Sequence, residues 1–265
     1  MATITASLVN ELRAKTGLGM MECKKVLTEV EGNLEAAIDA VRKKGVKASL
    51  TERAATEGRV ETLTHGNTAV AVEVVCNTDF TAKSDVVLDA AKLAAKKLAA
   101  GGDVSGDAEL TEALANASKV TGENVQLGRT ASVTGDVGSY LYSTAGKGKI
   151  GVLLQFSGPV QEDLVKSLGM HIAAARPVAL TRDAVPAELV AKEKEIAVEQ
   201  AKATGKPQEI AEKIALGKLN SFYAERVLLD QEFINGEIFK GKVSDLLKSK
   251  NVTLSQYVRL EVGQA

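Results

Sequence analysis

Hydrophobic positions change their spacing near residue 59, which separates a helical start from a mixed remainder. Before that point, apolar residues recur every three or four positions in three short groups, which are followed by Gly17, Gly32 and Gly45. This spacing is typical of short amphipathic helices, and a glycine after the last apolar residue favours a helix end. We therefore expect residues 1–54 to form a three-helix N-terminal module, with Asn33 capping the third helix. Its last residues, from about 46, are expected to form a linker.

From Arg59 onward, apolar and polar residues alternate, as they do in strands with one buried face. A β-hairpin is predicted around the turn His65-Gly66-Asn67, followed by helices at 84–99 and 109–118 and a strand at 126–134. The order then recurs, with strands at 140–142 and 149–156, helices at 161–175 and 243–250, and a strand at 256–262. We predict an α+β fold with two small antiparallel-sheet-plus-helix subdomains, 55–138 and 139–265. Their similar order suggests an old duplication.

Two charged amphipathic segments, 187–203 and 208–225, interrupt the second subdomain and are joined by Gly205-Lys206-Pro207. A glycine at the end of one helix and a proline at the start of the next are typical of an antiparallel helical hairpin. We expect this hairpin, at about 186–226, to project from the body. Its seam is predicted at the five apolar positions Leu189, Ile196, Ile210, Ile214 and Leu219.

Composition and charge narrow the classes of function. The 265 residues hold 33 Lys and Arg against 34 Asp and Glu, and a net charge of −1 gives no general attraction for a phosphate backbone. No apolar run approaches the roughly 20 residues that cross a bilayer, and the two cysteines form no CxxC pattern. We therefore expect a cytoplasmic protein with reduced thiols, no membrane contact and no direct nucleic-acid binding.

Three features could indicate enzyme chemistry, but each is better explained by a structural role. Cys76 and His65 could form a nucleophile and base, but no third orienting group can be named, so we interpret Cys76 as a small buried apolar residue. Residues 146–151 match GxGxxG but lead into a strand, whereas a dinucleotide site needs a helix there. His171 and His65 have no partner at metal-ligand spacing, and we expect them to be structural. The sequence thus predicts no catalysis, cofactor or metal.

The stretch Cys76-Asn77-Thr78-Asp79-Phe80-Thr81-Ala82-Lys83 places a large aromatic between a predicted strand and a predicted helix. Asp79 could cap the turn while Phe80 folds back as a hydrophobic staple. Alternatively, Phe80 is an exposed anchor for a partner, because burying a Phe contributes about 1.5 to 3 kcal/mol and interface aromatics are frequent hot spots. The pattern alone leaves both interpretations open.

A similar choice exists in the N-terminal module for Leu12, Met20 and Met21. Such residues are usually buried in a core, but two consecutive methionines cannot both face one core. Met20 shares a helical stripe with Cys23 and Leu27, which directs Met21 elsewhere. Methionine is well suited to adaptable protein contacts, so Met21 is a candidate contact residue.

Five segments in order resemble the bacterial elongation factor Ts family. They are Thr5 to Lys25, Asn77 to Lys83, Lys149 to Leu153, Met170 to Ala174, and Gly205 to Lys213. The resemblance covers nearly the whole chain. It implies that the N-terminal module is of the ubiquitin-associated type, and that the chain promotes GDP release from elongation factor Tu by disturbing its magnesium and phosphate site.

The resemblance also assigns expected roles to residues. Thr78, Asp79, Phe80 and Thr81 correspond to the family segment that intrudes on the partner's G domain, and Leu12, Arg13, Met20 and Met21 become candidate contacts to the same domain. The C-terminal half and the helical hairpin are expected to meet the other partner domains. The implied partner is elongation factor Tu, GDP-bound and nucleotide-free, and a homodimer within a heterotetramer is left open.

Two departures from the family pattern affect what can be carried over. Many members have a histidine shortly before the Ile-Gly-Val strand, where this chain has Tyr142 followed by a longer loop. Some members continue into a terminal helix where this sequence stops at Ala265, so that contact is expected to be missing. Without the resemblance, the residues do not separate an exchange factor from a non-catalytic binding scaffold.

Overall fold

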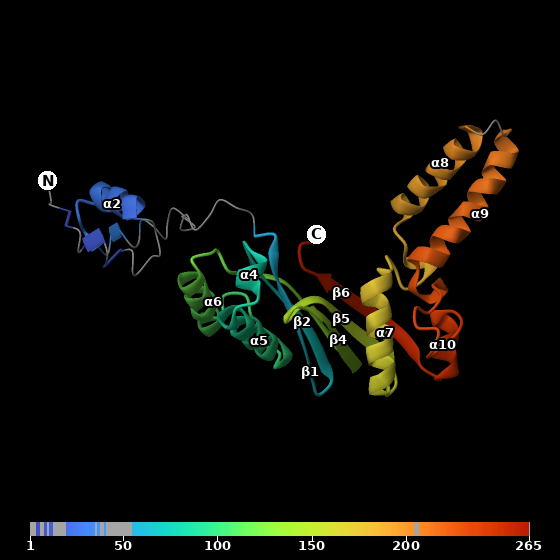
Figure 1. The fold of residues 1–265 in the computed structure, drawn as a ribbon, viewed down its shortest axis with the longest axis horizontal. Helices are drawn as coiled ribbons and strands as arrows, with labels where there is room; N and C mark the ends of the chain where they lie inside the picture. The colour runs from blue at the N-terminus through green and yellow to red at the C-terminus, as the bar shows by residue number, and fades with distance from the viewer. Residues whose placement is uncertain are drawn as a thin grey trace.

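The computed structural model describes residues 4–5, 8–9, 11–12, 20–34, 36–37, 40, 55–203 and 207–264. Its main body contains two three-stranded antiparallel sheets, each covered on its outer side by helices (Figure 1). The mixed helix and sheet content confirms the predicted α+β class. Arg13, Gly17, Gly45, the linker residues 46–54 and most of the hairpin turn at 204–206 lie outside the described residues.

The first sheet has the order β1-β2-β3. Its strands are β1 (Glu57–His65), β2 (Thr68–Cys76) and β3 (Gln126–Thr134). The short α4 (Asp79–Ala82), α5 (Asp85–Ala99) and α6 (Ala108–Thr121) follow β2 in the chain. The predicted hairpin and third strand are confirmed, whereas α4 falls in a stretch that was predicted only as a loop.

Alternation along β2 places its two faces in different surroundings. Val70, Val72, Val74 and Cys76 are buried among alanines, one valine and one leucine of α5 and α6. Ala69 and Ala71 point the other way and pack with residues of the second sheet, including Leu153 and Leu260. The small alanines on this inner face let the two sheets lie close together.

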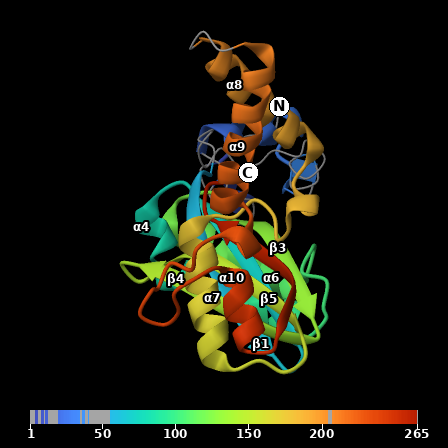
Figure 2. The ribbon, with the colours of Figure 1, turned by 90° about the vertical axis from the view of Figure 1, so that its right-hand side faces the viewer.

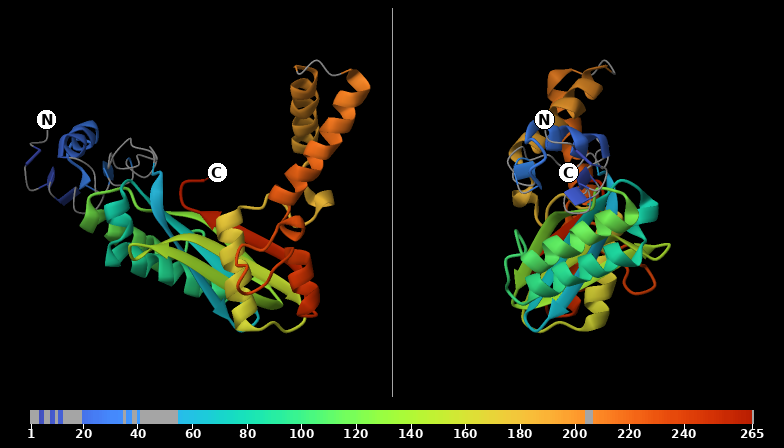
Figure 3. Two further views of the ribbon diagram at one scale, coloured as in Figure 1. Left: turned by 45° about the vertical axis from the view of Figure 1, so that its right-hand side comes forward. Right: turned by 90° about the vertical axis from the view of Figure 1, so that its left-hand side faces the viewer.

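The second sheet repeats the order of the first as β4-β5-β6. Its strands are β4 (Asp136–Thr144), β5 (Lys147–Ser157) and β6 (Thr253–Glu261), and its helices are α7 (Glu162–Ala175) and α10 (Val243–Ser249). Ile150, Val152, Leu154 and Phe156 of β5 share a core with these helices. The body is therefore layered as helices, sheet, sheet and helices (Figure 3).

The helical hairpin consists of α8 (Ala187–Ala203) and α9 (Gln208–Arg226), and it projects from the body as predicted (Figure 2). Its base is joined to the body through the short 3-10 helices η1 (Arg182–Ala184) and η2 (Leu228–Asp230). A cluster that includes Val185, Leu189, Phe222 and Val227 packs there.

The predicted seam of this hairpin is wrong at two positions. Ile196 and Ile210 are exposed, and the buried positions between the helices are the alanines Ala197, Ala201, Ala211 and Ala215. Each exposed isoleucine directly precedes a seam alanine, and one residue corresponds to about 100° of rotation around a helix. The predicted seam consists of large apolar side chains, whereas the observed contact between the two helices is made by small ones.

In the N-terminal part, α2 (Met20–Glu29) is the helix whose bounds are fully described, and described residues on both sides of it are also helical. Leu12, Cys23, Val26, Leu27 and Ala37 share one buried cluster. After α2, the Gly32 N–H donates to the Leu27 carbonyl at 2.8 Å. The Asn33 side chain accepts from the Ala36 N–H at 3.1 Å, which confirms Asn33 as a helix cap.

Candidate functional site

Phe80 lies on α4 with 85% of its surface exposed. An exposed fraction this large excludes the hydrophobic staple, because a staple packs its ring against the following helix. The side chain therefore contributes almost nothing to the core of this protein. In a chain that is only 3% aromatic, an exposed ring held on a short helix is a candidate contact for another molecule.

Thr78, and not Asp79, caps α4. Thr78 has extended backbone angles of φ −130 and ψ 154, and its hydroxyl accepts from the Thr81 N–H at 3.2 Å. Asp79 is the first residue inside the helix and lies one position too late to cap it. Of the two interpretations left open by the sequence, the one in which Asp79 caps the turn is therefore excluded, since the hydroxyl of its neighbour already occupies that place.

Asp79 instead pairs with Lys83 one turn later, with 2.9 Å between Oδ2 and Nζ. The hydrogen bond from Lys83 and its positive charge lower the pKa of the Asp79 carboxyl below its ordinary value. Both side chains are more than a third exposed, so this pair contributes little to stability. Asp79 thus keeps an ionised carboxylate at the surface beside Phe80.

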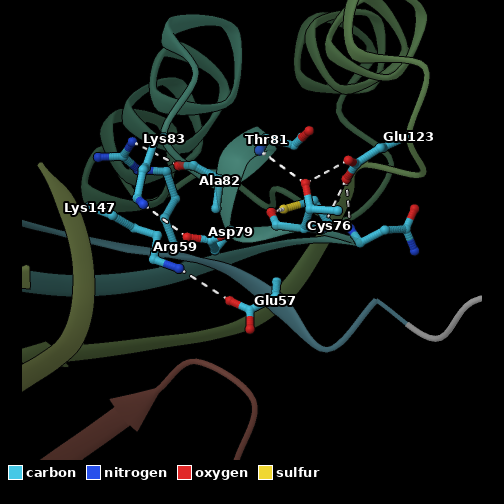
Figure 4. A network of polar contacts seen from close by, with 11 residues as sticks. Glu57, Arg59, Cys76, Asp79, Thr81, Ala82, Lys83, Glu123 and Lys147 are labelled. Atoms are coloured by element: carbon cyan, nitrogen blue, oxygen red, sulfur yellow. Dashed lines mark hydrogen bonds and ion pairs between the residues drawn. The ribbon is translucent and has the colours of Figure 1, made fainter. Parts of the chain in front are cut away.

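Glu123, in the turn between α6 and β3, holds the chain that leads into α4 (Figure 4). Its Oε2 accepts the backbone N–H groups of Asn77 and Thr78, each at 3.0 Å, and its Oε1 accepts the Thr78 hydroxyl at 2.6 Å. Burial alone would raise the pKa of Glu123, but hydrogen bonds from Thr78, Thr81 and Asn77 outweigh it and lower that pKa. Sequence reasoning missed this residue, because 45 positions separate it from Thr78.

Arg59 of β1 reaches the other end of α4. Its buried guanidinium donates to the Ala82 carbonyl at 3.2 Å and to the Glu61 carboxylate at 2.7 Å. A cation near the last carbonyl groups complements the partial negative charge at a helix end. Figure 4 shows Glu123 and Arg59 on opposite sides of α4.

A hollow of about 480 Å³ lies beside α4, where the turn between β4 and β5 comes close to it. Its lining is of mixed charge and includes Glu57, Asp79, Lys83 and Lys147. Lys147 pairs with Glu57 across 3.2 Å and so links β5 to β1. The surface around Phe80 therefore carries both signs of charge within a small area, a composition better suited to a protein contact than to a single anionic ligand.

The N-terminal candidates divide into buried and exposed residues. Leu12 is fully buried with Cys23 and Leu27, as expected for core packing. Met21 is 80% exposed, as predicted. Met20 is 56% exposed, although it was predicted to share the buried stripe of Cys23. It is the first residue of α2.

The enzyme interpretations do not fit the structure. Cys76 and His65 lie at opposite ends of the β1–β2 hairpin, since Cys76 pairs with Glu57 and His65 with Thr68, about 26 Å along the strand. Burial raises the pKa of the Cys76 thiol to about 11, so it stays protonated at neutral pH. Gly148 and Gly151 lie within β5, where the GxGxxG fingerprint would require a helix.

Among the residues that the structure describes, no three or more His, Cys, Asp or Glu side chains gather where they could hold a metal ion. In that same part of the chain, no helix combines the length and the apolar character needed to cross a membrane.

Comparison with known proteins agrees with the resemblance noted in the sequence. A family model described as "Elongation factor TS" matches residues 74–264. A protein of Erwinia tasmaniensis named elongation factor Ts is 42% identical over 275 residues, covering 100% of this chain and 93% of that protein. Proteins of the same name from Syntrophotalea carbinolica and Acinetobacter baumannii are each 40% identical, covering 98% and 100% of this chain and 93% and 92% of their own lengths. The chain therefore belongs to the elongation factor Ts family.

Proposed function

We propose that this chain acts in translation elongation as a guanine-nucleotide exchange factor, which binds elongation factor Tu and promotes the release of GDP. It acts by binding and carries out no chemical step of its own. The observation that carries the proposal is Phe80, which is 85% exposed at the tip of a short, firmly held helix. An aromatic in this position can enter a partner without first leaving a core of its own.

Residues 78–81 form the segment that disturbs the magnesium and phosphate site of the partner. Phe80 supplies the apolar wedge, and Asp79 supplies an ionised carboxylate beside it. Thr78 and Thr81 act mainly through the shape of α4, because Thr78 caps the helix and Thr81 is buried. The proposal thus divides the four residues into two that touch the partner and two that hold them in place.

The N-terminal module is proposed to bind the same G domain. Met20 and Met21 are exposed side by side at the start of α2, and their flexible side chains suit an adaptable contact. Leu12 is buried and packs in one cluster with Cys23 and Leu27 of α2. Arg13 remains a candidate contact from the resemblance alone. We also propose that the module is of the ubiquitin-associated type and that the chain divides into units 1–54, 55–138 and 139–265.

Energetics require more contacts than one ring can make. Loosening GDP a thousandfold corresponds to about 4 kcal/mol of coupling, whereas burying one Phe contributes about 1.5 to 3 kcal/mol. The second sheet and the helical hairpin are therefore proposed to bind other domains of the partner and hold its opened state. By linkage, GDP must weaken the binding of this chain to the partner by the same factor.

The setting of this activity follows from the family and the charge. The proposed location is the cytoplasm, with no direct nucleic-acid or membrane contact, and assembly as a homodimer within a heterotetramer stays open. The contact that many relatives make through a histidine is not carried over, because Tyr142 stands there at the exposed end of β4.

The test is the release of fluorescent GDP from elongation factor Tu in the presence of excess unlabelled nucleotide. Substoichiometric wild-type chain should accelerate release, and Phe80→Ala should slow the stimulated release about tenfold or more, as the loss of one buried aromatic predicts. Val120→Ala is the matched control, since Val120 is also a largely exposed apolar residue of the first subdomain, on α6. Its rate should stay near that of the wild type.

Two outcomes would count against the proposal. Binding without any acceleration by the wild type would indicate a scaffold in place of an exchange factor. Equal rates for Phe80→Ala and the wild type would remove the wedge from the mechanism while leaving the exchange activity itself standing.

A further inference from the structure

A helix of four residues cannot hold its own position. Helix nucleation is unfavourable, and isolated helices shorter than about 12 residues are marginal in water. Within α4, Thr81 and Ala82 are buried, while Asp79 and Phe80 face solvent. The direction in which Phe80 points must therefore be fixed by groups outside α4.

The turn between α6 and β3 provides such groups. Glu123 accepts two consecutive backbone N–H groups, of Asn77 and Thr78, and also the hydroxyl that caps α4. In the reverse direction, the Asn124 N–H donates to the Asn77 side-chain oxygen at 3.0 Å. These four bonds join two segments more than 40 positions apart in the chain.

The turn that presents Glu123 is itself well anchored. Gly122 ends α6 in the left-handed conformation, with φ 71, which turns the chain toward residue 77. The Glu123 N–H donates to the Thr121 hydroxyl, and the Val125 N–H donates to the Ser118 hydroxyl at 3.0 Å. Val125 is then buried in the same cluster as Ala82 of α4. Glu123 is therefore held by a rigid element.

We propose that Glu123 is a positioning residue for the exchange reaction: it fixes the start of α4 so that Phe80 is held ready for the partner. The inference rests on the proposed function and extends it to a residue outside the 77–83 segment. Arg59 assists at the other end by binding the Ala82 carbonyl. Glu123 acts through the cap of α4 and not by touching the partner.

The first test examines the free chain, so it does not depend on exchange activity. Amide hydrogen exchange is compared for the wild type, Glu123→Ala and Glu123→Gln, with Glu112→Ala as a control on the exposed side of α6. In Glu123→Ala, the amides of Thr81 and Ala82 should exchange about tenfold faster or more, as expected for lost hydrogen bonds to a charged group. Amides within β2 should be unchanged. In Glu123→Gln, these exchange rates should lie between those of the wild type and Glu123→Ala, because the one side-chain oxygen of Gln can still accept from the backbone.

The second test measures stimulated GDP release by the same four proteins. For Glu123→Ala, the maximum rate at saturating chain should fall about tenfold, while the half-saturating concentration should change much less. A merely structural weakening would lower protection throughout the first sheet and would change both kinetic values together. Partial rescue by Glu123→Gln is expected in both tests.

The outcomes separate this inference from the proposed function. Unchanged protection of α4 in both Glu123 variants overturns the inference, and if Glu123→Ala does not fold, Glu123→Gln decides alone. Slower stimulated GDP release with unchanged amide protection of α4 also overturns the inference, because Glu123 would then act on the partner directly. If the wild type does not accelerate GDP release, the proposed function fails, and the hydrogen-exchange result still shows whether Glu123 holds α4.

Discussion

At the scale of single residues, His171 shows how one buried polar side chain can connect three segments. It lies on α7 with 1% of its surface exposed and stacks on Phe233 at 5.4 Å between ring centroids. Its Nδ1 accepts from the Ile234 N–H at 3.2 Å, so its Nε2 carries the proton and donates to Gln231 at 3.0 Å. Gln231 in turn donates to the Glu225 carbonyl at the end of α9. The imidazole fits this network only in its neutral form.

This arrangement predicts a loss of stability in mild acid. Burial lowers the pKa of His171, and the hydrogen bond to Gln231 offsets this only in part. The unfolded chain therefore takes up the proton at a higher pH than the folded chain does. The contribution of His171 is complete above its ordinary pKa of about 6.5 and is lost as the pH falls below that value.

Urea unfolding at pH 7.5 and pH 5.5 tests this prediction, with His171→Gln as the control that cannot titrate. The wild type should lose more free energy of unfolding between the two pH values than His171→Gln does. Equal losses in the two proteins would show that other groups, such as carboxylates, cause the whole acid effect.

At the scale of elements, the helical hairpin is held together by alanines. Ala211 and Ala215 of α9 are fully buried, and Ala197 and Ala201 of α8 are nearly so. Small residues let two helices approach closely, but the gap between them then has no room for a larger side chain. Substitutions at the alanines should therefore change the stability of the hairpin more than substitutions at neighbouring exposed positions do.

We expect Ala215→Leu to destabilise the hairpin by about 1 to 3 kcal/mol, the usual cost of overpacking. Leu216→Ala, at the next and exposed position, should stay within about 0.5 kcal/mol of the wild type. Amide exchange across α8 and α9 measures both effects and separates them from changes in the body. A larger effect at Leu216 than at Ala215 would show that the buried alanines do not form the seam.

Sequence periodicity located most elements but not the contacts that form the site. The alternating strands β1 to β3 and the helices α7 to α9 follow from spacing, because burial of one face dictates where apolar residues fall. The exposure of Phe80 could not be decided from spacing, since a staple and an anchor share one local pattern. Glu123 could not be found either, because its bonds to Asn77 and Thr78 depend on how α6 folds back over β2.

At the scale of the whole molecule, the two sheets are held together by small residues and by a network of polar contacts around two buried carboxylates. The Glu73 carboxylate, 5% exposed, pairs with Arg129 at 2.8 Å, and Arg129 also donates to the Glu261 carbonyl of β6 at 2.6 Å. The Glu261 carboxylate binds Arg176 at the end of α7. One charged network therefore joins both sheets and a helix.

The two sheets approach each other closely at Gly148, and this leads to the most decisive stability prediction. A Cβ atom on Gly148 would lie 2.0 Å from the Val60 carbonyl oxygen, which is backbone and cannot swing aside. Gly148→Ala must therefore move β5 away from β1, and we expect a loss of about 1 to 3 kcal/mol or more in the free energy of unfolding.

Gly217→Ala is the matched change, because Gly217 lies within α9 and a Cβ there would meet nothing within 4 Å. Alanine at this position should stabilise the helix by about 0.5 to 1 kcal/mol, since it restricts the unfolded chain more than glycine does. Urea unfolding should therefore show a lower free energy of unfolding for Gly148→Ala and a higher one for Gly217→Ala. If Gly148→Ala were as stable as the wild type, the two sheets would have to be further apart than described.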